Sequence, residues 1–138
     1  MKTDFSTMTS CYSKSVYGDL YLTKNFQVKE FACKDGSDPV LVNIMLPLIC
    51  QAVRNWFGYP YSPNSAYRTI NHNANEKGSS NSLHIYGDAV DIPRGNVSAR
   101  ELYNFLDRLL GDSCELIYYS WGCHVGIQDE KERYPNGV

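Results

Sequence analysis

Two of the three histidines in the chain stand where they could bind a metal ion together with a carboxylate. His84 and Asp91 lie seven residues apart in the segment NSLHIYGDAVDIP, and His124 lies in the segment GCHVG. Because side chains alternate faces along a strand, an odd separation would put His84 and Asp91 on opposite sides of one straight strand. A turn centred on Gly87 would let Asp91 face His84, since glycine takes the backbone angles that reverse the chain.

His124 is expected on a strand whose other face is apolar. Alternate residues from Cys123 to Ile127 would point into a core, and His124 would share the other face with two glycines that leave room beside the imidazole. Two histidines and one carboxylate around an open position form the ligand set of a catalytic zinc ion, whose bound water becomes a nucleophile near neutral pH. The pattern therefore predicts a zinc site at His84, Asp91 and His124.

Each histidine taken alone has a simpler explanation. A single histidine on a partly apolar strand is more often a hydrogen-bonded core residue than a metal ligand. Asp91 is harder to explain in this way, because a carboxylate between Val90 and Ile92 needs a partner that offsets its desolvation. His72, the third histidine, lies in an Asn-rich segment, and hydrogen bonding within a loop is favoured for it over a role as a metal ligand.

The chain has the size and composition of one globular domain. It has 138 residues, of which 43% are hydrophobic and 20% are charged, and its formal net charge is -2. That length is enough to bury a core without disulfide bonds. Nucleic acid is not expected as a partner, because the chain lacks the basic excess that phosphate binding requires. We therefore predict a single domain over residues 1–138.

No segment predicts export or membrane insertion. The first residues, MKTDFSTMTSCYSK, lack the apolar core of a signal peptide, and no apolar run approaches the length of a membrane span. The five cysteines form no C-x-x-C pair, so reduced and mostly buried thiols are expected. We therefore expect synthesis in the cytoplasm and no membrane partner, and a target outside the membrane would require a separate route of release.

Two amphipathic helices are expected, each with clear ends. Apolar residues recur at three- and four-residue steps in the segment 43–57, Pro47 fits only in the first turn, and Gly58 ends the helix. A capping box begins the second helix at Ser98, and Gly111 stops it.

The remaining segments predict strands and irregular structure. Two strands are expected at residues 115–119 and 122–127. The segment before Arg68 is expected to be turn-rich and then extended, with Arg68 at the end of a strand. Irregular structure is expected for an N-terminal arm at 1–21, a loop at 69–80 and a solvated tail at 129–133. Because helices and strands mix without a βαβ rhythm, the fold class is α+β, with a small, mainly antiparallel sheet flanked by helices.

Three ordered motifs resemble those of a known enzyme family. The segment SLHIYGDAVDI is similar to the pattern S-x-H-x-x-G-x-A-x-D, followed by Ile or Val, of the zinc D-Ala-D-Ala carboxypeptidase and L-alanyl-D-glutamate peptidase family. The segment SAYRTINHN resembles that family's S-x-Y-R-S/T-x-x-x-N element, CHVGI resembles its final strand, and LTKNFQVKEFACKDGSDPVLVN resembles the opening of a phage and prophage branch. The family includes bacteriophage endolysins and shares its fold with the hedgehog signalling domain. The resemblance runs from Leu22 to Ile127 and implies this fold.

The resemblance also implies roles for single residues. His84, Asp91 and His124 match the zinc ligands, so Zn2+ is the expected cofactor. Arg68 matches an arginine that positions substrate, and a guanidinium can bind a peptide carboxylate or carbonyl at two points. Two interpretations of Ser82 stay open: it orients the substrate or its loop, or it is an ordinary turn serine.

The chain departs from the family at the position of the general base. Catalytically characterised relatives place Glu or Asp three residues before the last histidine ligand, where this chain has Trp121. The phage branch often has Asp two residues after that histidine, where this chain has Gly126. No acid occurs from residue 116 to residue 128, so the base is unassigned. The acids that folding could bring to the site are Glu115, Asp88 and Glu76.

The resemblance implies a zinc-dependent metallopeptidase that cleaves the stem peptides of bacterial peptidoglycan. A phage or prophage origin would make it a lysis or tail-associated enzyme, which acts on the cell wall after release or as a virion component, with other phage proteins among its partners. Two alternatives stay open. One is a non-catalytic module that keeps the fold and binds wall peptide or another phage protein, and the other is a structural domain whose histidines are hydrogen-bonded and bind no zinc.

Overall fold

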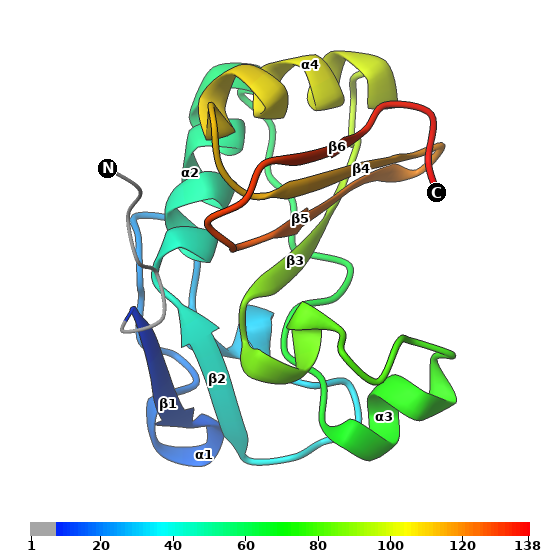
Figure 1. Ribbon diagram of the computed structural model, residues 1–138. Coiled ribbons are helices and arrows are strands. Elements are labelled where there is room, and N and C mark those ends of the chain that lie inside the picture. Colours follow the sequence, from blue (N-terminus) through cyan, green and yellow to red (C-terminus); the bar gives the residue numbers. More distant parts are fainter. Residues whose placement is uncertain (1–7) are drawn as a thin grey trace.

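The computed structural model describes residues 8–138 and contains two small β-sheets with helices packed around them (Figure 1). The first sheet pairs β1 (Thr9–Ser13) with β2 (Pro39–Asn43). The second has the strand order β3-β5-β4-β6. Its strands are β3 (Ala89–Pro93), β4 (Glu115–Tyr119), β5 (Gly122–Gly126) and β6 (Glu132–Tyr134). Every pairing is antiparallel except that of β4 with β6. The predicted α+β class with a mainly antiparallel sheet is confirmed.

Two helices pack against one face of the four-stranded sheet. The helix α2 (Met45–Phe57) contacts β3, and α4 (Ala99–Leu110) contacts β4 and β5. The core between them combines alternate strand residues with one side of each helix: Val90, Ile92, Leu116, Cys123, Val125, Leu46, Ile49, Val53, Leu102 and Leu106. Because strand side chains alternate, the residues between these positions lie on the other face of the sheet.

The ends of both long helices agree with the sequence-based prediction, except that α2 begins two residues later than expected, because Asn43 is the last residue of β2. Pro47 lies in the first turn of α2, and Gly58 follows its last residue with a left-handed φ of 76°. The Ser98 hydroxyl accepts a hydrogen bond of 3.0 Å from the backbone amide of Glu101 at the start of α4. Gly111 ends that helix. Local capping chemistry therefore defines the two elements that support the sheet.

Four shorter helical segments complete the fold: α1 (Lys14–Tyr17), η1 (Val28–Phe31), α3 (Ile70–Asn75) and η2 (Leu83–Tyr86). Across residues 8–138, no helix combines the length and apolar character that crossing a membrane requires.

The prediction of an irregular N-terminal arm is wrong for residues 9–17, which form β1 and α1. Both faces of β1 are partly exposed, so the strand shows no apolar alternation and is formed by its backbone pairing with β2. The carboxylate of Asp38 then accepts hydrogen bonds from the Ser13 hydroxyl, at 2.7 Å, and from the Ser15 amide, at 2.8 Å. Residues 1–7 lie outside the described part of the chain.

The expectations for residues 59–80 need two corrections. Residues 59–68 form no strand, and their one ladder contact is an isolated bridge between Ser65 and Asp91. Pro60 and Pro63 lack the backbone donors that a longer ladder would need. The expected loop 69–80 contains α3, whose first turn is capped by the Thr69 hydroxyl.

The polar tail is not simply solvated, because residues 132–134 form β6 alongside β4. The Arg133 guanidinium donates to the Asp107 carboxylate at 2.7 Å and to the backbone carbonyls of Cys114 at 2.7 Å and Gly111 at 2.8 Å. These acceptors are mostly main-chain groups distant in sequence, so the charge pattern gave no sign of them. Arg133 fixes the connection from α4 to β4.

The register of the sheet aligns residues of three strands in one row, and two of them are polar. Asp91 on β3 pairs with His124 on β5, and His124 pairs with Ile117 on β4. Paired residues of adjacent strands project from the same face, so Asp91 and His124 lie next to each other on the face opposite the helices. The predicted strands at 115–119 and 122–127 are confirmed, except that β5 ends one residue earlier, at Gly126.

Candidate metal centre

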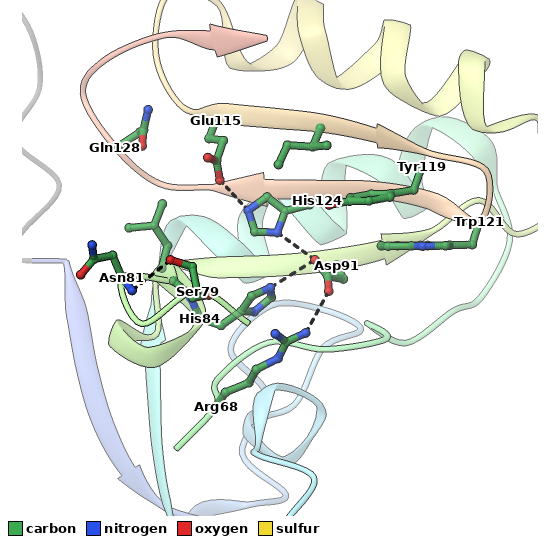
Figure 2. A pocket seen from close by; sticks show the side chains of 13 residues that line it. Arg68, Ser79, Asn81, His84, Asp91, Glu115, Tyr119, Trp121, His124 and Gln128 are labelled. Atoms are coloured by element: carbon green, nitrogen blue, oxygen red, sulfur yellow. Dashed lines mark hydrogen bonds and ion pairs between the residues drawn. The ribbon is translucent and has the colours of Figure 1, made fainter. Parts of the chain in front are cut away.

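Three side chains from three different elements meet at the centre of this sheet face (Figure 2). His84 comes from η2, Asp91 from β3 and His124 from β5. One ligand atom from each lies within 4.8 Å of the other two. The Asp91 Oδ1 atom is 2.9 Å from His124 Nδ1 and 3.3 Å from His84 Nε2. The structure thus brings together the three residues predicted as metal ligands.

The turn between His84 and Asp91 depends on Gly87. This residue ends η2 with a φ of 72°, a left-handed conformation that side chains other than glycine rarely adopt. A Cβ atom at this position would lie 2.5 Å from the carbonyl oxygen of Leu41 on β2. The Ser82 hydroxyl caps the same segment by accepting a hydrogen bond of 3.3 Å from the His84 amide. This hydrogen bond connects Ser82 to the segment that carries His84.

The ring of His84 is oriented by a backbone carbonyl. Its Nδ1 atom lies 2.6 Å from the carbonyl oxygen of Ala66, which can only accept, so Nδ1 carries the proton and donates. In the neutral ring, Nε2 then presents a lone pair to the Asp91 carboxylate 3.3 Å away. His84 Nε2 and the Asp91 oxygen are then two acceptors in close contact, and His84 is only 3% exposed, so a proton or a metal cation is required between them. The donor set fits zinc, which binds imidazole nitrogen and carboxylate oxygen.

His124 contacts one carboxylate on each side of its ring. Its Nδ1 atom lies 2.9 Å from Asp91 and its Nε2 atom lies 2.6 Å from the Glu115 carboxylate. Burial alone would lower the pKa of His124, but the hydrogen bonds to Asp91 and Glu115 raise it to about 9. Burial would raise the pKa of Asp91, yet its hydrogen bonds with His124 and His84 hold that pKa below its usual range. In the metal-free protein, the proton on His124 supplies the positive charge that Asp91 requires.

Arg68 lies on the other side of Asp91. Its Nη2 atom is 3.5 Å from Asp91 Oδ2, and its Nε atom donates to the Ser65 hydroxyl at 3.0 Å. The Asn73 side-chain oxygen accepts from Nη1 at 3.4 Å. Asn73 is buried on α3 and also donates to the carbonyl of Ser79, so α3 serves to hold the arginine. Asn73 is the last residue of the S-x-Y-R-S/T-x-x-x-N element, but its contact with Arg68 could not be inferred from the sequence, because it depends on the fold of residues 69–80.

His84, Asp91 and His124 line a pocket of about 560 Å³, and its two ends differ in chemistry. Ser79, Asn81 and Gln128 lie on one side of the centre, and Tyr119 and Trp121 lie on the other (Figure 2). The two aromatic rings are nearly parallel, at 9° with centroids 5.0 Å apart. Sequence reasoning did not single out Tyr119, although its even spacing from Glu115 on one strand was a usable signal.

The candidate acids are placed very differently. Glu115 lines the pocket, whereas Asp88 accepts hydrogen bonds from Thr9 at 2.8 Å and Asn43 at 3.2 Å, away from it. Glu76 directly follows α3 and lies 3.6 Å from the Nε2 atom of His72, and neither residue lines the pocket. Among the described residues that line the pocket, the carboxylates are therefore those of Asp91 and Glu115 alone.

We expect metal-free protein to lose stability as the pH rises through the pKa of His124. Folding raises this pKa from 6.5 to about 9, so the bound proton stabilises the native state fully below pH 6.5, and the contribution is lost as the pH passes about 9. Thermal unfolding of chelator-treated protein should therefore show a Tm that decreases as the pH rises from 6.5 to about 9. The fall should shrink in His124→Gln. Equal pH profiles for the two proteins would contradict the prediction.

Comparison with known proteins agrees with this geometry. A search of curated proteins finds no match to the chain. The sequence model of the family described as peptidase M15 matches residues 21–125, a range that contains the pocket's arginine and all three predicted metal ligands. This match covers well over half of the 138 residues. The chain belongs to the peptidase M15 family.

Proposed function

We propose that the protein is a zinc-dependent metallopeptidase that cleaves peptidoglycan stem peptides. The observation that carries the proposal is the convergence of His84, Asp91 and His124 in a pocket that also contains Arg68. Membership of the peptidase M15 family supports a metallopeptidase acting on a peptidoglycan-type substrate. A D-Ala-D-Ala carboxypeptidase-like specificity is the finer part of the proposal and is supported by resemblance of the motifs.

The proposed zinc ligands are His84 Nε2, Asp91 Oδ1 and His124 Nδ1. These atoms face one another, while His84 Nδ1 and His124 Nε2 are held by the Ala66 carbonyl and by Glu115. A zinc ion held in this way would supply a Lewis acid that polarises a carbonyl. It would also lower the pKa of a water molecule, which becomes a nucleophile near neutral pH.

Arg68 is proposed to bind the substrate. Its guanidinium lines the pocket beside Asp91, and its side chain is 15% exposed, so part of it is available to a peptide carboxylate or carbonyl. The contacts with Ser65 and Asn73 fix the plane of the guanidinium before substrate arrives, which lowers the entropic cost of a two-point contact. For Ser82, the proposed role is to orient the loop that carries His84 and, as a pocket residue, the substrate.

The general base is the weak part of the catalytic set. Trp121 lines the pocket at the family position of the acid, and a stacked indole cannot take a proton from water. Glu115 is the one carboxylate of the described pocket residues that is not a proposed ligand, and its oxygen is bound to His124 Nε2. We therefore expect slow hydrolysis, because a positioned base typically contributes about 100- to 10,000-fold.

The biological setting is proposed from resemblance. Residues 22–43 resemble the opening of a phage and prophage branch, which supports a lysis or tail-associated enzyme. Such an enzyme is made in the cytoplasm and meets the cell wall after release or as part of the virion, where other phage proteins are its partners.

A second function is a wall-peptide binding module that has lost catalysis. The specific observation in its favour is Trp121, which replaces an acid with an aromatic surface that is 38% exposed in the pocket. A module of this kind would keep Arg68 and the ligand set but release no product.

Cleavage of defined stem peptides separates these functions. Zinc-loaded protein, incubated with peptides that end in D-Ala-D-Ala and with longer stem peptides, should release products that mass spectrometry identifies, and a chelator should stop the release. Restoring an acid with Trp121→Glu should increase the rate, because the base is what the pocket lacks. If neither protein cuts any peptide while both bind it, the enzyme is refuted and the binding module is supported.

Arg68→Lys tests the substrate role. Lysine keeps the charge but loses the planar two-point contact, and one hydrogen bond to a charged group is worth about 1.5–3 kcal/mol, so kcat/KM should fall about 10- to 100-fold. Zinc content and Tm should stay at the wild-type level. Arg108→Lys, at an exposed position of α4, is the matched control. Equal kinetics for Arg68→Lys and wild type would remove Arg68 from the substrate site.

A further inference from the structure

Glu115 reaches the metal centre from the strand beside His124. Its carboxylate Oε1 atom lies 2.6 Å from His124 Nε2, and this is a short contact for a hydrogen bond between nitrogen and oxygen. The Glu115 side chain is 23% exposed and the His124 side chain is 12% exposed, so water competes little for the bond. Figure 2 shows the carboxylate directed at the ring edge.

The position of this contact decides what Glu115 can do. The two nitrogens of an imidazole point away from each other, and Nδ1 is the one that faces Asp91, at 2.9 Å. A carboxylate on Nε2 therefore lies beyond the ring, on the side away from the ligand atoms of His84 and Asp91. Glu115 is placed to act on the histidine rather than on a water molecule between the three ligands.

The neighbouring strand is shaped to admit this carboxylate. Glu115 on β4 pairs in register with Gly126 on β5, two residues beyond His124. A Cβ atom at residue 126 would lie 2.9 Å from Glu115 Oε1 and 2.6 Å from the Leu83 side chain. Only glycine leaves this space free. Glu115 therefore supplies the carboxylate, and Gly126 opposite it leaves the space that the carboxylate occupies.

We propose that Glu115 is a positioning residue that fixes the tautomer of His124. By accepting the proton of Nε2, it leaves the lone pair of Nδ1 directed at Asp91 and His84, and its negative charge makes that nitrogen a stronger donor to a cation. This inference rests on the proposed zinc site but assigns a role that the ligand set alone does not contain. It also means that Glu115 does not fill the vacant role of general base.

Zinc affinity, measured by competition with a chelating dye, tests the proposal. Glu115→Ala should bind zinc about 10- to 100-fold more weakly, as loss of such a hydrogen bond to a ligand typically does. Glu115→Gln should lose less, because its amide oxygen still accepts from Nε2 but lacks the charge. Glu132→Ala is the control: residue 132 pairs with Glu115 through the backbone of the sheet, but its carboxylate accepts hydrogen bonds from Gln128 and Tyr134.

A transplanted carboxylate gives the sharper test. A side chain at residue 126 would begin beside the place that Oε1 occupies, so Gly126→Asp combined with Glu115→Ala should recover most of the lost affinity. Gly126→Ala combined with Glu115→Ala adds the same Cβ without a carboxylate and should not recover it. Circular dichroism and Tm of all five variants check that each is folded.

The tautomer is observed directly in the nitrogen-15 NMR spectrum of the imidazoles. Zinc-loaded wild type should show His124 protonated at Nε2, and Glu115→Ala should show faster exchange of that proton. Wild-type zinc affinity in folded Glu115→Ala would overturn the proposal, as would a proton on Nδ1. These readouts do not depend on hydrolysis, so a wild type that binds zinc but cuts no stem peptide would refute the proposed function and leave the role of Glu115 standing.

Discussion

The structure of the site depends on one buried carboxylate that needs a positive charge. Asp91 is 9% exposed and projects between the nitrogens of His84 and His124, with the guanidinium of Arg68 at its other oxygen. An unpaired carboxylate would be costly at this position, so a proton, the arginine and a metal ion are the groups that can stabilise it. Hydrogen bonds to Asp91 and Glu115 raise the pKa of His124 to about 9, which favours a proton beside Asp91 in the metal-free protein. In the proposed zinc site, metal and proton would compete for this place.

The fold provides this environment with elements that are individually short. Antiparallel pairing puts Asp91 and His124 side by side, and α2 and α4 bury the opposite face of the same strands. The left-handed turn at Gly87 brings His84 back over β3, and the Ala66 carbonyl sets the orientation of its ring. In the proposed zinc site each ligand would be held by a group that is not a ligand: His84 by the Ala66 carbonyl, His124 by Glu115 and Asp91 by Arg68.

Local sequence patterns predicted much of this arrangement. The rest depends on long-range backbone contacts, which such patterns do not reveal. Periodicity and capping residues were enough for α2, α4, β4 and β5, and the alternation around His124 gave the correct buried face. By contrast, β1, α3 and β6 are held by main-chain pairing or by single polar contacts, which leave no apolar period in the sequence. The pairing of Glu115 with Gly126 follows from the two-residue turn between β4 and β5, and the predicted strand ends already contained it. The contact of the Glu115 carboxylate with His124 did not follow, because it depends on the direction of a long side chain across the sheet face.

The most direct test of the account is the location of zinc in a crystal of the zinc-loaded protein, measured by anomalous diffraction at the zinc absorption edge. The account predicts one peak per chain, about 2.0–2.2 Å from His84 Nε2, an Asp91 carboxylate oxygen and His124 Nδ1. Glu115 should remain on His124 Nε2. A peak coordinated through His124 Nε2, a peak elsewhere on the chain, or no peak in zinc-saturated crystals would contradict it.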